Sequence, residues 1–187
     1  MKRATSFISD LQAREATAAR ALEFTILTAA RSGEVLGARW DELDLDGAMW
    51  AVPAARMKGA REHRVPLSPR ALAIIKALHY SRDSGFVFGG QKAGKPLSVT
   101  ALKMVLRRMK IENVTVHGFR SAFRDWAAEC TNFANEVCEA ALAHVIENKA
   151  EAAYRRGDMI DKRRKLMEAW ATYCTTPTVG KVVAFKR

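Results

Sequence analysis

Hydrophobic residues recur with a helical period along most of the chain. From residue 14 to residue 30, apolar side chains such as Leu22 and Ile26 stand three or four positions apart, and many alanines favour helix. Ser68 is placed to cap another helix, which has Pro69 as its first residue. The same spacing predicts helices over residues 35–40, 99–109, 117–130, 134–144, 149–156 and 161–174.

Two short segments alternate apolar and polar residues as strands do. Residues 49–52 follow an Asp-Gly pair typical of turns, and residues 64–67 show the same alternation. Lys58 and Gly59 are expected at or beside the tip of the hairpin that joins them. With helices in the majority and a small antiparallel sheet near residues 45–67, the chain is expected to adopt an α+β fold.

The charge of the chain points to a polyanionic partner. Its 187 residues, 49% of them hydrophobic, fit one globular domain. There are 31 Lys and Arg against 20 Asp and Glu, a formal net charge of +11, which favours nucleic acid as a ligand. No apolar run reaches the roughly 20 residues that cross a bilayer. The N-terminus lacks the apolar centre of a signal peptide, so we expect a cytoplasmic protein without membrane contact.

The cysteines do not indicate a disulfide framework or a zinc site. Cys130, Cys138 and Cys174 are odd in number and lack Cys-x-x-Cys spacing. We expect three small buried thiols and no metal site.

Several polar residues could carry chemistry, although each alone has an ordinary structural explanation. His117 and Arg120 lie three apart at the start of a predicted helix, where free N–H groups and an arginine fork bind phosphate well. A surface salt bridge and a capping imidazole would explain the same pair. Arg31 could cap helix carbonyls, Glu34 could pair with Arg31 or with another cation, and His144 could end an apolar stripe as a core histidine. Two further candidates are Lys58 in the basic hairpin turn and Tyr154, which precedes two arginines.

In this order along the chain, the candidates resemble the active site of the tyrosine recombinases, the phage integrase family. The likeness covers residues 19–174 and is closest to integrases of satellite phages and bacterial genomic islands. It implies the mostly helical catalytic-domain fold of that family. The matching segments are TAARSGEVLGARWDELDLD, RMKGAREHRVPLS, VTVHGFRSAFRDWAAE and EAAYRRGDMIDKRRKLMEAWATYC. One departure is the motif LAH, where many relatives have glycine in the middle.

The resemblance implies phosphoryl transfer on double-stranded DNA without a metal ion or any cofactor. Arg31 and Arg120 would clamp the scissile phosphate, supported by the carboxylate of Glu34. Tyr154 would attack the phosphate and form a 3′-phosphotyrosyl intermediate, while Lys58 protonates the leaving 5′-oxygen. The bond energy is kept in the intermediate, so a 5′-hydroxyl can rejoin the strand.

The resemblance also assigns the two remaining histidines and a set of DNA contacts. His117 would act as a base or proton relay for the tyrosine, and His144 would donate a hydrogen bond to the phosphate. Tyr80 and Tyr173 do not follow LAH at a short interval, and we expect them to be packing residues. Candidates for binding the DNA backbone are Arg56, Arg61, Arg124, Arg155 and Arg156.

Domain organisation and partners follow from the same resemblance. Residues 1–175 would form the catalytic domain, and residues 176–187 a tail that adds an edge strand or docks on a partner. The core-binding and arm-binding domains usual in the family are absent from this sequence, which would make it an excised fragment or a truncated gene. On the bacterial chromosome we expect other recombinase protomers, assembled as a tetramer on the attachment-site core, and accessory DNA-bending proteins.

The implied function is site-specific recombination in the integration or excision of a prophage or genomic island. A relaxing activity like that of a type IB topoisomerase would share the phosphotyrosyl step. The alternative is a non-catalytic DNA-binding remnant or regulatory fragment of an integrase. An RNA-binding domain has little support, since the sequence has neither an RNP-type aromatic strand nor a Gly-x-x-Gly clamp.

Overall fold

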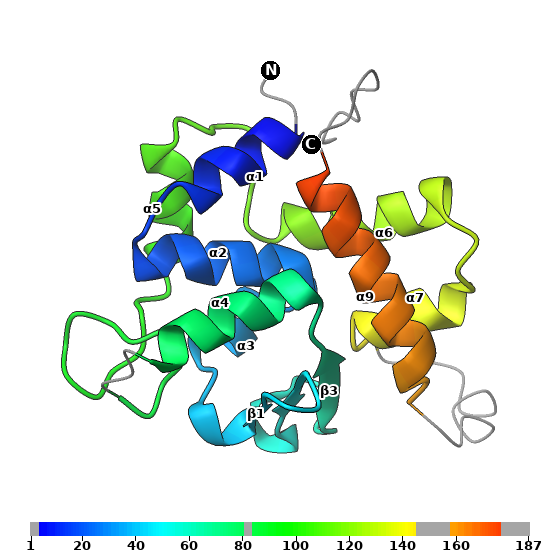
Figure 1. The fold of residues 1–187 in the computed structure, drawn as a ribbon, viewed down its shortest axis with the longest axis horizontal. Helices are drawn as coiled ribbons and strands as arrows, with labels where there is room; N and C mark the ends of the chain where they lie inside the picture. The colour runs from blue at the N-terminus through cyan, green and yellow to red at the C-terminus, as the bar shows by residue number, and fades with distance from the viewer. Residues whose placement is uncertain (1–3, 81–83, 145–157, 177–187) are drawn as a thin grey trace.

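A computed structural model describes residues 4–80, 84–144 and 158–176 of the chain. Its architecture is mostly helical with one antiparallel sheet, in the strand order β1-β2-β3 (Figure 1), which confirms the predicted α+β class. The strands are β1 Leu43–Asp44, β2 Met49–Val52 and β3 His63–Pro66, with 3₁₀ turns η1 Trp40–Glu42 and η2 Ala54–Arg56. The helices are α1 Ala4–Gln12, α2 Thr17–Thr28, α3 Ser32–Leu36, α4 Pro69–His79, α5 Ala101–Arg108, α6 Gly118–Cys130, α7 Asn135–Ala141 and α9 Ile160–Thr175.

Helix α2 forms the centre of the core. Every residue from Ala21 to Thr28 is buried, because α1, α4, α5 and α9 all pack against this helix (Figure 1). On the side of the sheet, the ring of Phe24 lies 5.5 Å from that of Trp50 in β2 and 5.5 Å from that of Phe88. The carboxyl end of α2 is thereby held at a fixed place in the interior.

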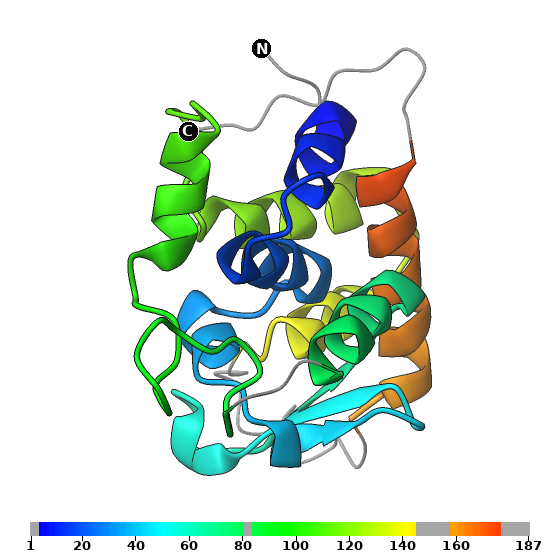
Figure 2. The same cartoon turned by 60° about the vertical axis from the view of Figure 1, so that its left-hand side comes forward.

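Helix α9 ties together parts of the chain that are distant in sequence. It contacts α1, α2 and α7 as well as strand β3 (Figure 2). The indole N–H of Trp170 donates a hydrogen bond of 2.8 Å to the carbonyl of Ile26, and its ring meets Phe123 edge to face at 5.4 Å. Near the start of α9, buried Arg163 donates to the carbonyl of Arg64. The sheet is therefore fixed to the same core as α2.

We expect Trp170→Phe to lower the free energy of unfolding by about 1–2 kcal/mol, because a buried hydrogen bond and part of the ring packing are lost. Urea denaturation of both proteins measures the change. Glu168→Gln, exposed on the same helix, is the control and should leave the midpoint unchanged. An equally unchanged midpoint for the tryptophan variant would contradict a structural role for this contact.

Most predicted elements are confirmed to within a few residues, with some differences. Helix α1 and strand β1 were not predicted from the sequence, and β3 begins one residue earlier than expected. The helix predicted over residues 35–40 is wrong in its bounds, since α3 ends at Leu36 and a separate 3₁₀ turn follows. The helix predicted over 149–156 and most of the tail lie outside the described residues.

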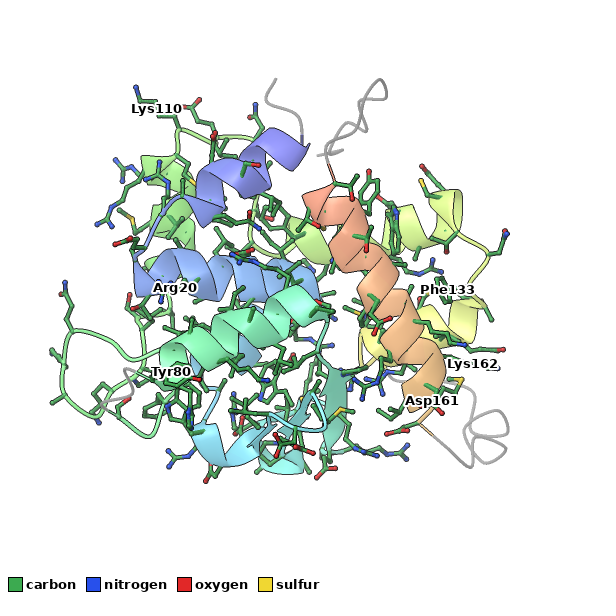
Figure 3. The ribbon with its side chains drawn as sticks, in the orientation of Figure 1. Arg20, Tyr80, Lys110, Phe133, Asp161 and Lys162 are labelled. Carbon is green, nitrogen blue, oxygen red and sulfur yellow. The ribbon has the colours of Figure 1, made fainter. Side chains whose placement is uncertain are left out.

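Two predictions about buried side chains are wrong. Tyr80 is 90% exposed (Figure 3), because the buried face of α4 ends at Leu78 and Tyr80, two residues later, points away from it. Cys130 is exposed at the carboxyl end of α6, although the other two cysteines are buried. Tyr173 packs as predicted, with its ring 5.5 Å from that of Trp126. None of the described helices is long and apolar enough to span a membrane.

Candidate functional site

Arg120 lies where the carboxyl ends of two helices meet. It belongs to the first turn of α6 and is 6% exposed. Its Nη1 donates to the carbonyl of Ala29, just after α2, and its Nη2 donates at 2.8 Å to the carbonyl of Leu142, just after α7. Helix carboxyl ends carry partial negative charge, which favours a cation there. The fold therefore holds one guanidinium rigidly in the interior, with its orientation set from both sides.

The positive charge of a second arginine, Arg31, affects the Arg120 guanidinium. Burial and then the positive charge of Arg31 lower the pKa of Arg120 to about 10, while the carboxylate of Glu34 acts in the opposite direction. Arg120 is still protonated at neutral pH, so two neighbouring guanidinium groups repel each other here. An anion bound between them would relieve that repulsion. The positive charges of Arg31 and Arg120 therefore favour an anionic ligand near them.

Glu34 fixes Arg31 through a local motif. The backbone N–H of Arg31 donates a hydrogen bond of 2.9 Å to Oε2 of Glu34. The Nη1 of the Arg31 side chain donates one of 2.8 Å to Oε1 of the same carboxylate. The Glu34 side chain is 5% exposed, whereas that of Arg31 is 31% exposed and can still meet a ligand. Arg56 holds the same turn, since its guanidinium donates to the Glu34 carbonyl and pairs with Glu42. The sequence left the partner of Glu34 open between Arg31 and another cation, and the structure shows Arg31.

The way in which helix α7 ends brings His144 next to Arg120. Helix α7 ends at Ala141, three residues before the predicted end, and Ala143 has a left-handed φ of 49°. The backbone N–H of His144 then donates to the carbonyl of Glu139 at 3.1 Å, as in a Schellman ending. The turn places His144 Nε2 at 3.5 Å from Arg120 Nη2. The imidazole is thus beside the buried guanidinium, not in a helical stripe.

Glu139 was not singled out from the sequence, yet it connects two candidate residues. Its Oε2 lies 2.6 Å from His144 Nδ1, and its Oε1 accepts a hydrogen bond of 2.6 Å from Arg124 Nε. Burial raises the pKa of the Glu139 carboxyl, but the hydrogen bonds from His144 and Arg124 outweigh it, and the pKa is lowered overall. The carboxylate is therefore ionised at neutral pH.

His63 is the other residue that sequence reasoning missed. It is buried in β3, and its pKa is lowered to about 3 by burial first and then by the positive charges of Arg163, Arg120 and Arg31. A hydrogen bond to the backbone of Ala141 acts in the opposite direction. The imidazole is neutral at neutral pH and links the sheet to the end of α7.

The remaining predicted residues are not part of this cluster in the described structure. Lys58 and Arg61 are exposed between η2 and β3, and His117 is exposed at the N-cap of α6, where it makes no capping hydrogen bond. Tyr154, Arg155 and Arg156 lie outside the described residues. No group of three or more His, Cys, Asp or Glu side chains that could hold a metal ion occurs in the described ranges.

The structure brings Arg31, Arg120 and His144 together on a mostly helical domain. Residues 1–159 match the model of the phage integrase family, so the chain belongs to that family. Prophage integrase IntA of Escherichia coli K12 is 38% identical over 161 residues, which are 84% of this chain and 39% of that protein. The integrase of Enterobacteria phage P4 is 34% identical over 171 residues, 82% of this chain and 39% of that protein. The chain thus spans about two fifths of the length of these curated relatives.

Proposed function

We propose that this chain carries the catalytic domain of a site-specific recombinase that cleaves and rejoins double-stranded DNA. The observation that supports it most is the closeness of Arg31 and His144 to the buried guanidinium of Arg120 in a member of the phage integrase family. A DNA phosphodiester offers two non-bridging oxygens, which suits a pair of guanidinium groups. The net charge of +11 fits a DNA ligand as well.

In this proposal the arginines stabilise the charge that develops on the scissile phosphate. Arg120 is fixed by two helix ends and Arg31 by Glu34, so neither needs to reorient during the reaction. Donors that are already aimed at the developing charge are the main source of catalysis in such transfers. His144 adds a hydrogen bond to a phosphate oxygen. The guanidinium groups supply the positive charge that a metal ion supplies in other phosphoryl transfers.

The chemical step is a transesterification. The hydroxyl oxygen of Tyr154 attacks the phosphorus, and the bond from phosphorus to the 5′-oxygen breaks as the tyrosine–phosphate bond forms. His117 takes the proton of the tyrosine, and Lys58 gives a proton to the leaving oxygen. In the reverse step, a 5′-hydroxyl attacks the phosphotyrosine and rejoins a strand. No external energy source is needed, because one ester replaces another.

Substrate and partners follow the same proposal. The substrate is the core of an attachment site, and other protomers, as a tetramer, and accessory DNA-bending proteins complete the reaction in the bacterial cytoplasm. Residues 1–175 form the catalytic domain in this scheme. Among the described candidates for the DNA backbone, Arg61 is exposed, whereas Arg56 and Arg124 already pair with Glu42 and Glu139. Arg61 is therefore better placed for a phosphate contact than Arg56 or Arg124, whereas Arg155 and Arg156 are candidates outside the described residues.

Covalent capture of DNA tests the proposal. Nicked DNA that carries a candidate attachment core is incubated with the protein, and a denaturant-stable protein–DNA band is sought. We expect a band with wild type and none with Tyr154→Phe, because phenylalanine has no nucleophilic oxygen. Tyr80→Phe is the control, since it removes the hydroxyl of an exposed tyrosine, and it should keep the band.

The outcome also decides between catalysis and the alternative of a non-catalytic DNA-binding fragment. The assay is repeated with the chain fused to the core-binding domain of a relative, so that weak DNA binding by this region alone would not hide cleavage. A band that persists in Tyr154→Phe would refute the assigned nucleophile. No band in either format, with DNA still bound, would favour the non-catalytic alternative.

A further inference from the structure

We propose that Glu139 is a positioning residue for His144, fixing its imidazole through Nδ1 so that Nε2 is presented to the phosphate beside Arg120. The inference rests on the proposed function, since it concerns the same site.

The first support is that two separate hydrogen bonds join the same two residues. The backbone N–H of His144 donates to the Glu139 carbonyl at 3.1 Å, and the side chains meet at 2.6 Å between Nδ1 and Oε2. The His144 side chain is 45% exposed, so packing alone leaves its ring free to rotate. A hydrogen bond to one ring nitrogen fixes both the orientation of an imidazole and the position of its proton.

The second support is that Glu139 is itself held in place. Arg124 on α6 donates to the second carboxylate oxygen at 2.6 Å and also donates to Asn135 at the start of α7. The carboxylate is therefore bound on both oxygens, one partner on each side. Arg124 and Arg120 lie four residues apart on α6, so one helix carries both the phosphate-binding arginine and the anchor of the histidine.

The chemistry of the imidazole completes the argument. With Nδ1 donating to a carboxylate, Nε2 is the nitrogen left to face the ligand, and it lies 3.5 Å from Arg120 Nη2. To donate to a phosphate oxygen, Nε2 must carry a proton too, which gives the ring a positive charge. The negative charge of Glu139 balances that positive charge at hydrogen-bonding distance. Glu139 acts through His144 and does not itself touch the substrate.

Single-turnover rates of covalent-complex formation on nicked DNA test the role. We expect Glu139→Ala to slow cleavage by about 10-fold to 100-fold, the loss that follows when a metal-binding histidine loses the carboxylate that orients it. Glu139→Gln should slow cleavage less than Glu139→Ala, because the amide oxygen of glutamine can still accept a hydrogen bond from His144 Nδ1. Glu129→Ala, which removes an exposed carboxylate at the other end of α6, is the control and should react at the wild-type rate.

A combined variant separates positioning from general damage to the fold. If Glu139 acts through His144, Glu139→Ala should slow a His144→Ala protein by no more than about twofold, because effects of coupled residues do not multiply. Full multiplication of the two losses would overturn the proposal. So would a Glu139→Ala single variant that cleaves as fast as wild type.

A spectroscopic readout on the free protein does not depend on DNA cleavage. Nitrogen-15 NMR of the imidazoles, with the His144 signal identified by its loss in His144→Gln, reports which ring nitrogen holds the proton. We expect a protonated Nδ1 in wild type and a shift toward protonated Nε2 in neutral Glu139→Ala. An unprotonated Nδ1 in wild type would refute the positioning, whereas the expected signal in a protein that never cleaves DNA would refute the proposed function alone.

Discussion

Arg120→Ala is expected to slow covalent-complex formation on nicked DNA by about 10³-fold or more, the range seen when an arginine that stabilises a phosphoryl-transfer transition state is lost. The same change removes the donor to the carbonyls of Ala29 and Leu142 in the interior. Each carbonyl left unpaired costs about 1–3 kcal/mol, so the free energy of unfolding should fall as well. Rates are therefore measured at a temperature where circular dichroism shows the variant folded.

Arg120→Lys is the matched variant for this test. Lysine keeps the positive charge but lacks the planar fork that reaches two carbonyls and a phosphate at once. We expect it to bind DNA with nearly wild-type affinity and to remain far slower than wild type in cleavage. A folded Arg120→Ala protein that cleaves within tenfold of wild type would contradict the clamp.

Acidification is expected to destabilise the protein through His63. The pKa of this imidazole is lowered from 6.5 to about 3 in the folded state, so below pH 6.5 the unfolded chain binds a proton that the folded protein does not. His63 therefore does not lower the free energy of unfolding above pH 6.5. As the pH falls from 6.5 toward 3, the free energy of unfolding decreases by about 1.4 kcal/mol per pH unit. By pH 4 the loss should reach about 3 kcal/mol.

Urea unfolding at pH 7, 5.5 and 4 measures this effect. His63→Gln should depend less on pH than wild type, because glutamine does not titrate, while every other ionisable group is the same in both proteins. His117→Gln changes an exposed histidine and should keep the wild-type pH dependence. Parallel pH profiles for wild type and His63→Gln would show that His63 is not held neutral.

The sequence predicts those parts of the molecule that depend on local pattern. The apolar period predicts the helices, and an acidic residue three positions after Arg31 has the spacing of a capping box, which the structure has at the start of α3. The inward position of His63 was also open to prediction, because it alternates with buried Val65 along β3. Its charged neighbours come from α6, from α9 and from the residue before α3, however, and no local pattern shows which elements will cover a strand.

The link from Glu139 to His144 could not be predicted for a physical reason. In a continuous helix, residues five apart point about 140° away from each other, because each residue turns the chain by about 100°. They meet only because α7 ends at Ala141 and the chain reverses at Ala143. Alanine gives no sign of such a turn, since glycine is the residue that usually adopts a left-handed φ at a helix end.

The two carbonyls that hold Arg120 belong to residues 91 and 22 positions away along the chain. Contacts of this kind form only after long loops have closed. The orientation of the Arg120 guanidinium is therefore fixed only in the folded domain. Local opening at the end of α7 would release the Leu142 carbonyl and His144 together. The amide hydrogen of His144, which is bonded to Glu139, therefore exchanges with solvent at a rate that reports how often the site comes apart.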